Sequence, residues 1–398
     1  MTKPLYIGAI DIGSNKIKGM IAKKQRDSSQ IEVLSLREVP SFGVRKGIIV
    51  DKDKVCQKVL ELKNLLIEEN QKELKEVFVN IGGYHIFVKQ TSGAIAISRA
   101  DQKVSQEDIE RVIEASRSLT LPFNKEVLEV VPKEFIIDGE RGIKNPLNLK
   151  GIKLEVESLA ICAFSPYVKN LIDAILCADL EIAEIIPSPI AASIAVLTPQ
   201  QKELGVALVD IGAGSTSIAV FEEGGLIHLA ILPVGSSHIS NDIAIALQTE
   251  IEIAEKIKLK FGEYIFKKSR RKEKIEIKPN QFFTFSLAKM ANAGKARVSE
   301  ILGLIKKELK KIGKLKSLPA GVVLTGGGSN LKGIVDFAKK ETGLPTKKVS
   351  PKGFINLQPD PSLSVLCGLI LKGFEEESEE KGSKFFEKIK KVFRVFLP

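Results

Sequence analysis

The sequence predicts an α/β protein built from two similar lobes, and three observations lead to this fold class. An apolar strand at residues 5–11 ends in the loop Asp11-Ile12-Gly13. Another apolar strand, at residues 205–210, ends in the matching loop Asp210-Ile211-Gly212. Each loop leads into two further strands and a helix, so the same order of elements occurs twice. Such repetition is typical of a duplicated structural unit.

Apolar runs and helical spacing predict the elements of both lobes. In the first lobe we expect strands at residues 5–11, 16–22, 31–39 and 77–81 and an amphipathic helix at residues 52–70. In the second lobe we expect strands at residues 205–210, 217–221, 226–234 and 320–324, and helical segments at residues 241–248, 252–260 and 285–312.

The segment between the two lobes has elements of its own. Residues 105–118 are predicted to form a helix, which Ser105 can cap because Asp108 stands three residues later. Residues 127–137 favour a strand, and Pro132 places that strand at the edge of its sheet because proline cannot donate a ladder hydrogen bond.

Composition narrows the class of protein. The chain has 398 residues, enough for at least two domains, and 44% of them are apolar, as in ordinary soluble proteins. No run of about 18 apolar residues is present, so a membrane-spanning helix is not expected. The first residues lack a signal-peptide pattern, and we expect a protein that stays in the cytosol.

The cysteines and histidines indicate neither a zinc site nor disulfides. The histidines are scattered, and the cysteines stand at Cys56, Cys162, Cys177 and Cys367 without paired spacing. We therefore expect reduced thiols in the core.

The net charge of +11 is concentrated in a few segments, namely residues 256–278, residues 306–316 and the end of the chain. The first two are interpreted as solvated outer faces. Tryptophan is absent and aromatic residues are not interleaved with the basic runs, so a surface for nucleic-acid bases is not expected.

The two Asp-Ile-Gly loops have the chemistry of phosphate-binding loops. Glycines after a strand let backbone N–H groups approach phosphate oxygens closely. Asp11 and Asp210 can hold a hydrated Mg²⁺, which takes one or two carboxylates and keeps several waters. A single such loop could be an ordinary tight hairpin, but two loops in matching places favour a binding site. A third glycine run, residues 325–329, follows a strand and suits a base and ribose.

Taken together, these loops resemble those of the actin-like ATPase superfamily, whose fold is ribonuclease H-like. Within it the chain resembles the FtsA family of bacterial cell-division proteins. Residues 130–138 and 142–147 are similar to an α+β subdomain inserted in the first lobe of that family, and residues 189–197 to its connecting helix. The basic C-terminal segment is similar to its membrane anchor.

The resemblance implies an ATP site with Mg²⁺ between the lobes. From the first lobe it assigns Asp11, Gly13, Ser14, Asn15 and Lys16 to the phosphates, and from the second Asp210, Gly212, Ala213, Gly214, Ser215 and Thr216. The adenosine would lie on Gly326, Gly327, Gly328 and Ser329. Glu255 and Lys258 match a pair that contacts base and ribose, although an ordinary exposed ion pair is the alternative.

Three positions depart from the superfamily pattern. Ala213 replaces a common glycine, and Ser217 stands where relatives often carry aspartate. Ser188 occupies the place where hydrolases of the superfamily have Glu or Gln to orient water. Because a hydroxyl is a poor general base at neutral pH, at most slow ATPase activity is expected.

Residues 384–398 predict an amphipathic helix that lies on an anionic membrane surface. Its predicted membrane contacts are Phe385, Phe386, Lys388, Ile389, Lys391, Val392, Phe393, Arg394, Phe396 and Leu397. The alternatives are a terminal helix docked on the body of the protein and a helix that binds a partner.

The predicted organisation follows from these assignments. The first lobe comprises residues 1–82, 163–190 and 357–373, with the inserted subdomain at 83–162. The second lobe comprises residues 191–247 and 319–356, with a small subdomain at 248–318. An acidic, solvated linker at 374–383 leads to the membrane-binding helix.

The resemblance implies a filament-forming protein that tethers the tubulin-like division protein FtsZ to the cytoplasmic face of the membrane at the division site. The C-terminal tail of FtsZ would dock on the helix that contains Arg297 and Glu300. Two alternatives share the fold: an adaptor for pilus assembly like PilM, and a sugar-kinase-like phosphotransferase.

Overall fold

The computed structural model describes residues 4–25, 28, 30–70 and 74–379 of the chain. The strands of the first lobe are β1 (Leu5–Ile12), β2 (Lys16–Lys24), β3 (Ile31–Pro40), β6 (Glu76–Ile81), β11 (Glu181–Pro187) and β19 (Phe354–Ile355), and a short hairpin of β4 (Val44–Arg45) and β5 (Ile48–Ile49) accompanies them. Those of the second lobe are β12 (Val206–Ile211), β13 (Thr216–Glu222), β14 (Gly225–Leu232), β17 (Val322–Thr325) and β18 (Thr346–Lys348).

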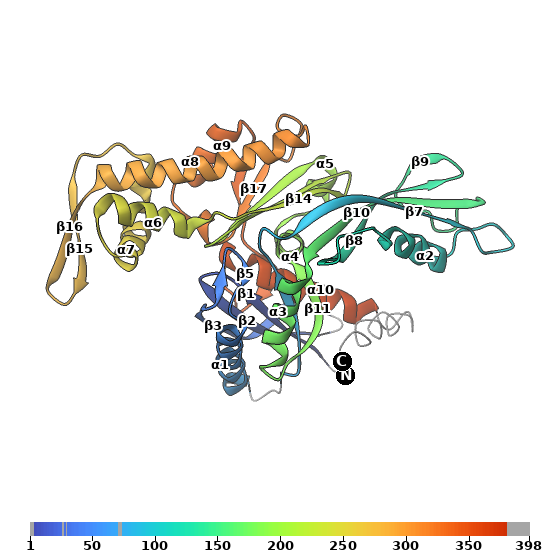
Figure 1. Cartoon of the computed structure of the whole chain (residues 1–398), viewed down its shortest axis with the longest axis horizontal. Helices are drawn as coiled ribbons and strands as arrows, with labels where there is room; N and C mark the ends of the chain where they lie inside the picture. The colour runs from blue at the N-terminus through green and yellow to red at the C-terminus, as the bar shows by residue number, and fades with distance from the viewer. Residues whose placement is uncertain (1–3, 26–27, 29, 71–73, 380–398) are drawn as a thin grey trace.

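The two lobe sheets repeat the same central pairing. Their strand orders are β11-β6-β1-β2-β3-β19 and β14-β13-β12-β17-β18. β1 pairs antiparallel with β2 and parallel with β6, while β12 pairs antiparallel with β13 and parallel with β17. The predicted duplication is therefore present in the topology, and Figure 1 shows one sheet above the other.

Four helices belong to the first lobe: α1 (Lys52–Asn70), α3 (Ser165–Leu176), α4 (Ser188–Val196) and α10 (Ser364–Glu379). The helix expected at residues 52–70 has these bounds, and its apolar stripe is fully buried at Val55, Val59, Leu62 and Leu66. A Cβ atom at Gly19 of β2 would lie 2.6 Å from the Leu66 side chain, so this glycine lets α1 approach the sheet. α4 runs from β11 into the second lobe, and α10 returns to pack on α4 and β1.

The second lobe carries α5 (Pro199–Leu204), α6 (Ser236–Leu247), α7 (Ile251–Phe261), α8 (Leu287–Lys311) and α9 (Ile334–Thr342), with short 3₁₀ turns η1 (Gly262–Phe266), η2 (Gly327–Asn330) and η3 (Pro361–Leu363) near them. The basic segment before α8 contains an unpredicted hairpin of β15 (Lys272–Lys278) and β16 (Gln281–Ser286). Ile275 and Phe285 are buried on its inner face, while Lys272 and Lys274 are exposed as expected.

The inserted subdomain projects to one side of the lobes, opposite the β15–β16 hairpin (Figure 1). Its sheet has the order β7-β10-β8-β9, formed by β7 (Phe87–Ala96), β8 (Lys125–Ile137), β9 (Glu140–Ile143) and β10 (Lys153–Phe164), and α2 (Gln106–Arg117) covers it. Ser105 and Asp108 form the predicted capping box. β9 pairs only with the end of β8, so at Pro132 no described strand pairs with β8 on its outer side, and β8 forms the edge of the sheet there, as predicted. Pro132 also lies beside a shift in the register between β8 and β10.

The sequence predicts a solvated linker at residues 374–383, but the first part of this segment is helical. α10 continues to Glu379, and the Phe374 side chain is only 2% exposed. The preceding Gly373 lies against Ile7 and Phe78, because a Cβ there would come within 2.8 Å of either side chain. Apolar contact with the first-lobe sheet thus extends the helix into the acidic run. No helix among the described residues is both long and apolar enough to cross a membrane.

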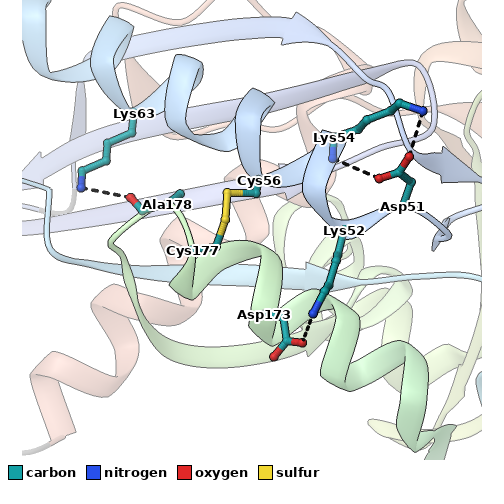
Figure 2. The surroundings of a disulfide bond; sticks show 8 residues. All are labelled: Asp51, Lys52, Lys54, Cys56, Lys63, Asp173, Cys177 and Ala178. Carbon is teal, nitrogen blue, oxygen red and sulfur yellow. Dashed lines mark hydrogen bonds and ion pairs between the residues drawn. A yellow bond between two sulfur atoms is a disulfide. The ribbon is translucent and has the colours of Figure 1, made fainter.

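The prediction of four reduced cysteines is wrong for one pair. Cys56 on α1 and Cys177 just after α3 form a disulfide, with their Cα atoms 6.0 Å apart (Figure 2). The residues are separated by 121 positions, and only the packing of α1 against α3 brings them together. Cys162 and Cys367 are buried free thiols, as expected.

A group of half-buried ionisable side chains joins the inserted subdomain to the first lobe. Glu129 of β8, Glu184 of β11 and Glu376 of α10 surround Lys372, and Lys372 forms an ion pair with Glu376 at 3.5 Å. Burial, and then the neighbouring Glu376, raises the pKa of Glu184 to about 9. Glu184 therefore keeps its proton at neutral pH.

We predict that Glu184 makes the protein less stable as the pH rises from about 4.5 to about 9. The folded pKa lies above the ordinary one, so the folded state keeps a proton that the unfolded state releases. The contribution is fully present below the ordinary pKa and is lost as the pH rises through the folded pKa. Urea denaturation across this range measures how the free energy of unfolding changes with pH. The change should be smaller in Glu184→Gln than in the wild type, and it should equal that of the wild type in the exposed control Glu61→Gln. Equal slopes for all three proteins would contradict the assignment.

Candidate nucleotide site

The two Asp-Ile-Gly loops have the same geometry. Each is a four-residue turn between antiparallel strands, since Ile12 pairs with Ile17 and Ile211 pairs with Thr216. The N–H of Gly13 donates to the carbonyl of Lys16 at 3.1 Å. In the second lobe the N–H of Gly212 donates to the carbonyl of Ser215 at 3.0 Å. The sequence resemblance between the loops is thus a structural equivalence.

The two aspartates lie close together between the lobes. Asp11 is 8% exposed, and its burial raises its pKa. Burial, and then the charge of Asp11, raises the pKa of Asp210 to about 7. Lys18 opposes both shifts. Two buried carboxylates from different lobes, whose pKa values are both raised, would be stabilised by a cation placed between them.

Lys18, not Lys16, is the lysine of this site. The register of β1 and β2 places Lys18 directly opposite Asp11, and its Nζ donates to the carbonyl of Ser362. Lys16 instead forms an exposed ion pair with Glu38. The structure therefore places Lys18, rather than Lys16, beside the aspartates. The signal that points to Lys18 is the strand register, since a four-residue turn after Ile12 pairs residue 11 with residue 18.

The two Asp-Ile-Gly loops are in contact where the lobes meet. A Cβ atom at Gly214 would lie 2.6 Å from the Ser14 Oγ atom and 3.1 Å from the Lys46 backbone nitrogen. Ser14 Oγ accepts a hydrogen bond from the N–H of Gly47 at 2.9 Å. The β4–β5 hairpin thus forms a third wall of the site, which the sequence did not suggest.

The third glycine run, residues 325–329, packs against the second Asp-Ile-Gly loop. Gly326 has a φ of +80°, and a Cβ atom there would overlap the Asp210 carboxylate. A Cβ atom at Gly328 would lie 2.9 Å from the carbonyl of Ile211. Only glycine fits at these two places. Ser329 is buried and donates to the carbonyl of Gly326 at 2.7 Å, so it shapes the turn, while Gly327 is exposed.

The predicted pair Glu255 and Lys258 is formed beneath the second loop. Their side chains lie 2.7 Å apart, and Lys258 also donates to the carbonyl of Ser236 at 3.1 Å. Ser236 begins α6, and its N–H donates to the carbonyl of Gly212 at 2.8 Å. Lys258 is therefore buried against the start of α6, which holds the second loop in place. This burial contradicts the alternative of an ordinary exposed ion pair.

The remaining predicted loop residues act through their backbone or support the turn. The carbonyl of Asn15 accepts from the N–H of Ser41 at 3.0 Å. The carbonyl of Ala213 accepts from the N–H of Ser237 at 3.0 Å and from its hydroxyl at 2.6 Å. Thr216 is fully buried and donates to the carbonyl of Val234 at 2.8 Å.

Ser188, at the start of α4, has its hydroxyl engaged by the protein. Its Oγ donates to the carbonyl of Ile81 at 3.0 Å and accepts from the Asn80 amide at 3.0 Å. The carbonyl of that amide accepts from the N–H of Ile12 at 2.7 Å. Asn80, which sequence reasoning missed, therefore ties the first phosphate loop to the connecting helix, and Ser188 serves this link.

The predicted partner residues lie apart from the loops, on α8. Arg297 binds the Asp242 carboxylate of α6 through two hydrogen bonds of 2.7 and 2.9 Å, and it bonds Glu300 at 2.6 Å. The predicted membrane residues, all between residues 384 and 398, lie outside the described part of the chain.

Comparison with known proteins agrees with this architecture. The family model described as cell division protein FtsA matches residues 207–368, and the model of the SHS2 domain inserted in FtsA matches residues 83–162. The cell division protein FtsA of Bacillus subtilis is 34% identical, over 92% of this chain and 82% of that protein. This chain belongs to the FtsA family. FtsA of Pseudomonas aeruginosa is 31% identical, over 94% of this chain and 90% of its own length.

Solved structures confirm the actin-like fold expected for an FtsA protein. MreB5 of Spiroplasma citri bound to ADP has a TM-score of 0.56 at 14% identity, covering 96% of this chain and 98% of its own. The PilM–PilN type IV pilus biogenesis complex gives a TM-score of 0.67 at 17% identity, covering 92% and 98%. At such identities these likenesses concern the fold alone.

We predict that Gly214→Ala separates the two phosphate loops. The added methyl group would meet Ser14, so the loops must shift, and overpacking of this kind destabilises proteins by about 1–3 kcal/mol. Gly303→Ala is the matched control, because it lies in α8 with open space around it. Denaturation and nucleotide titration should show losses of stability and affinity for Gly214→Ala only. Normal nucleotide affinity in Gly214→Ala would contradict the close approach of the loops.

Proposed function

We propose that this FtsA protein binds ATP with Mg²⁺ between its lobes. The observation that carries the proposal is the meeting of Asp11, Asp210 and Lys18 at the point where three glycine turns converge. Glycines without a side chain let the backbone of such turns approach phosphate oxygens closely. The membership of the FtsA family and the fold shared with an ADP-bound MreB support this function.

The residues fit a magnesium nucleotide better than a metal held by protein alone. The described residues contain no group of three or more His, Cys, Asp or Glu side chains arranged to hold a metal. Mg²⁺ typically takes one or two carboxylates and completes its octahedron with water and phosphate oxygens. Asp11 and Asp210 would supply those carboxylates through water, and Lys18 would neutralise phosphate charge. Bound Mg²⁺ would in turn compensate the two buried carboxylates.

We further propose that hydrolysis of ATP is slow. Orientation of an attacking water needs a free acceptor near the phosphates. The Ser188 hydroxyl donates a hydrogen bond to the carbonyl of Ile81 and accepts one from the side-chain amide of Asn80. Both bonds link the first lobe to the connecting helix, so the hydroxyl is not free to orient a water molecule. ATP then acts chiefly to set the lobe geometry, and its hydrolysis is secondary.

We predict that Lys18→Ala weakens ATP binding at least tenfold, a loss of about 1.4 kcal/mol, because Lys18 lies beside both aspartates. Lys16→Ala should leave affinity nearly unchanged, since exposed ion pairs contribute little. Titration with a fluorescent ATP analogue compares the two variants, and phosphate release by the wild type measures turnover. Equal losses in both variants, or a wild-type turnover of many ATP per second, would contradict these assignments.

In the cell we propose that the protein forms filaments on the cytoplasmic face of the membrane at the division site and tethers FtsZ there. The family assignment supports this role. The amphipathic pattern of residues 384–398 supports membrane attachment, since its basic side chains add attraction to anionic lipid. Assembly would strengthen attachment, because many weak anchors act together.

Deletion of residues 384–398 should abolish co-sedimentation with anionic liposomes and leave ATP binding intact, because the nucleotide residues lie elsewhere. Electron microscopy on anionic lipid monolayers with ATP should show filaments for the full chain and none for the deletion variant. The double substitution Phe393→Glu and Phe396→Glu is the matched control, because it removes apolar side chains of the predicted helix without shortening the chain. Liposome binding by the deletion variant would refute the anchor.

We propose that the acidic C-terminal tail of FtsZ docks at Arg297 and Glu300 on α8. Arg297 is 24% exposed in its side chain and lies in a basic part of the chain. Arg297→Glu should weaken tail binding, whereas Lys307→Glu, an exposed charge reversal on the same helix, should have a smaller effect. Fluorescence anisotropy with a tail peptide measures both. Because Arg297 also binds Asp242, thermal denaturation of each variant separates lost docking from lost folding, and an unchanged affinity in folded Arg297→Glu would exclude this site.

A further inference from the structure

The Cys56–Cys177 disulfide lies on the outside of the first lobe and is within reach of small thiols. Cys177 is exposed, and Cys56 is 9% exposed. A Cα separation of 6.0 Å is ordinary for a disulfide, so bond formation requires little movement of the helices. The other two cysteines are buried, and burial raises the pKa of the thiols of Cys162 and Cys367. Oxidation is therefore directed to the exposed pair.

Polar contacts hold the two helices together independently of the sulfur bond. Lys52 pairs with Asp173 at 2.8 Å, and Lys63 donates to the carbonyls of Ala178 and Asp179 at 3.1 and 2.7 Å. Figure 2 shows the Lys52–Asp173 and Lys63–Ala178 contacts on either side of the disulfide. After reduction the two thiols thus stay near each other. This arrangement suits a bond that forms and breaks without unfolding.

The end of α3, where Cys177 forms the disulfide, is connected to the candidate nucleotide site. Along α3 and its end, Asn170, Asp173 and Cys177 all contact the segment between residues 49 and 56. Asn170 donates to the carbonyl of Ile49 at 3.1 Å, at the end of the β4–β5 hairpin. The turn of that hairpin donates the Gly47 N–H to Ser14 and lies against Gly214. A constraint on residues 49–56 is therefore a constraint on the wall of the phosphate site.

We propose that Cys56 and Cys177 form a reversible redox site that rigidifies the β4–β5 hairpin when it is oxidised. The oxidant is a disulfide compound such as oxidised glutathione. One cysteine thiolate attacks one sulfur of the oxidant, which forms a mixed disulfide with the protein and releases the other half of the oxidant as a thiol. The second cysteine thiolate then attacks the protein sulfur of the mixed disulfide, which forms the Cys56–Cys177 bond and releases the second thiol. The protein pair loses two electrons and two protons, and the oxidant is reduced to two thiols. The proposal concerns the hairpin itself and does not depend on ATP binding.

The experiment compares the full chain after treatment with oxidised glutathione and after treatment with a phosphine reductant. Alkylation and peptide mass spectrometry should show Cys56 and Cys177 bonded in the first sample and free in the second. Oxidation should raise the thermal midpoint by about 5 °C, because the bond closes a long loop. Hydrogen exchange of residues 43–51 should slow several-fold, without nucleotide present.

Cys56→Ser and Cys177→Ser are the matched controls, and in each the oxidised and reduced treatments should give the same midpoint and the same exchange. These comparisons are made within one variant, so a loss of stability from the substitution itself does not affect them. The proposal is overturned if glutathione leaves the pair reduced. It is equally overturned if the bond forms while exchange of residues 43–51 stays unchanged.

Discussion

The crossing of α4 and α10 is the contact on which the arrangement of the two lobes depends. α4 carries the chain from the first lobe to the second, and α10, which follows the return of the chain at β19, packs against α4. At the crossing a Cβ atom on Gly368 would overlap the backbone of Ala191, so the helices are in direct backbone contact. Their buried residues join those of both sheets in one core, which includes Leu366 of α10 and Leu208 of β12. The lobes therefore meet at a distance set by close packing.

This spacing produces the electrostatics of the site. Asp11 and Asp210 end equivalent strands in different lobes, and only the packing between the lobes makes them neighbours. Lys18 lowers the pKa of both carboxylates, but burial outweighs its effect, and the proposed cation would compensate the remaining cost. The hydroxyl of Ser188 and the amide of Asn80 are used to tie the loop to α4. The same residues that fix the lobe geometry are thus unavailable to orient water, and this supports the proposal of slow ATP turnover.

Local patterns predicted much of the fold because they arise from contacts close in sequence. The helix at residues 52–70 follows from its apolar spacing, and the cap at Ser105 from a side chain three residues away. The β15–β16 hairpin was missed because its lysines hide the alternation of Ile275 with exposed positions. The segment after Phe374 was misjudged because its helix depends on contact with β1 and β6, which charge composition does not reveal.

The sequence by itself determined the duplication, the three glycine loops, the family and the aspartates of the site, because these are repeated or contiguous motifs. Only the tertiary structure decided that Lys18 and not Lys16 faces the aspartates, since this depends on strand register. It also decided that the β4–β5 hairpin forms a wall of the site and that Cys56 meets Cys177. These features join residues far apart in the chain, and their spacing in the sequence contains no information about the distance between them in space.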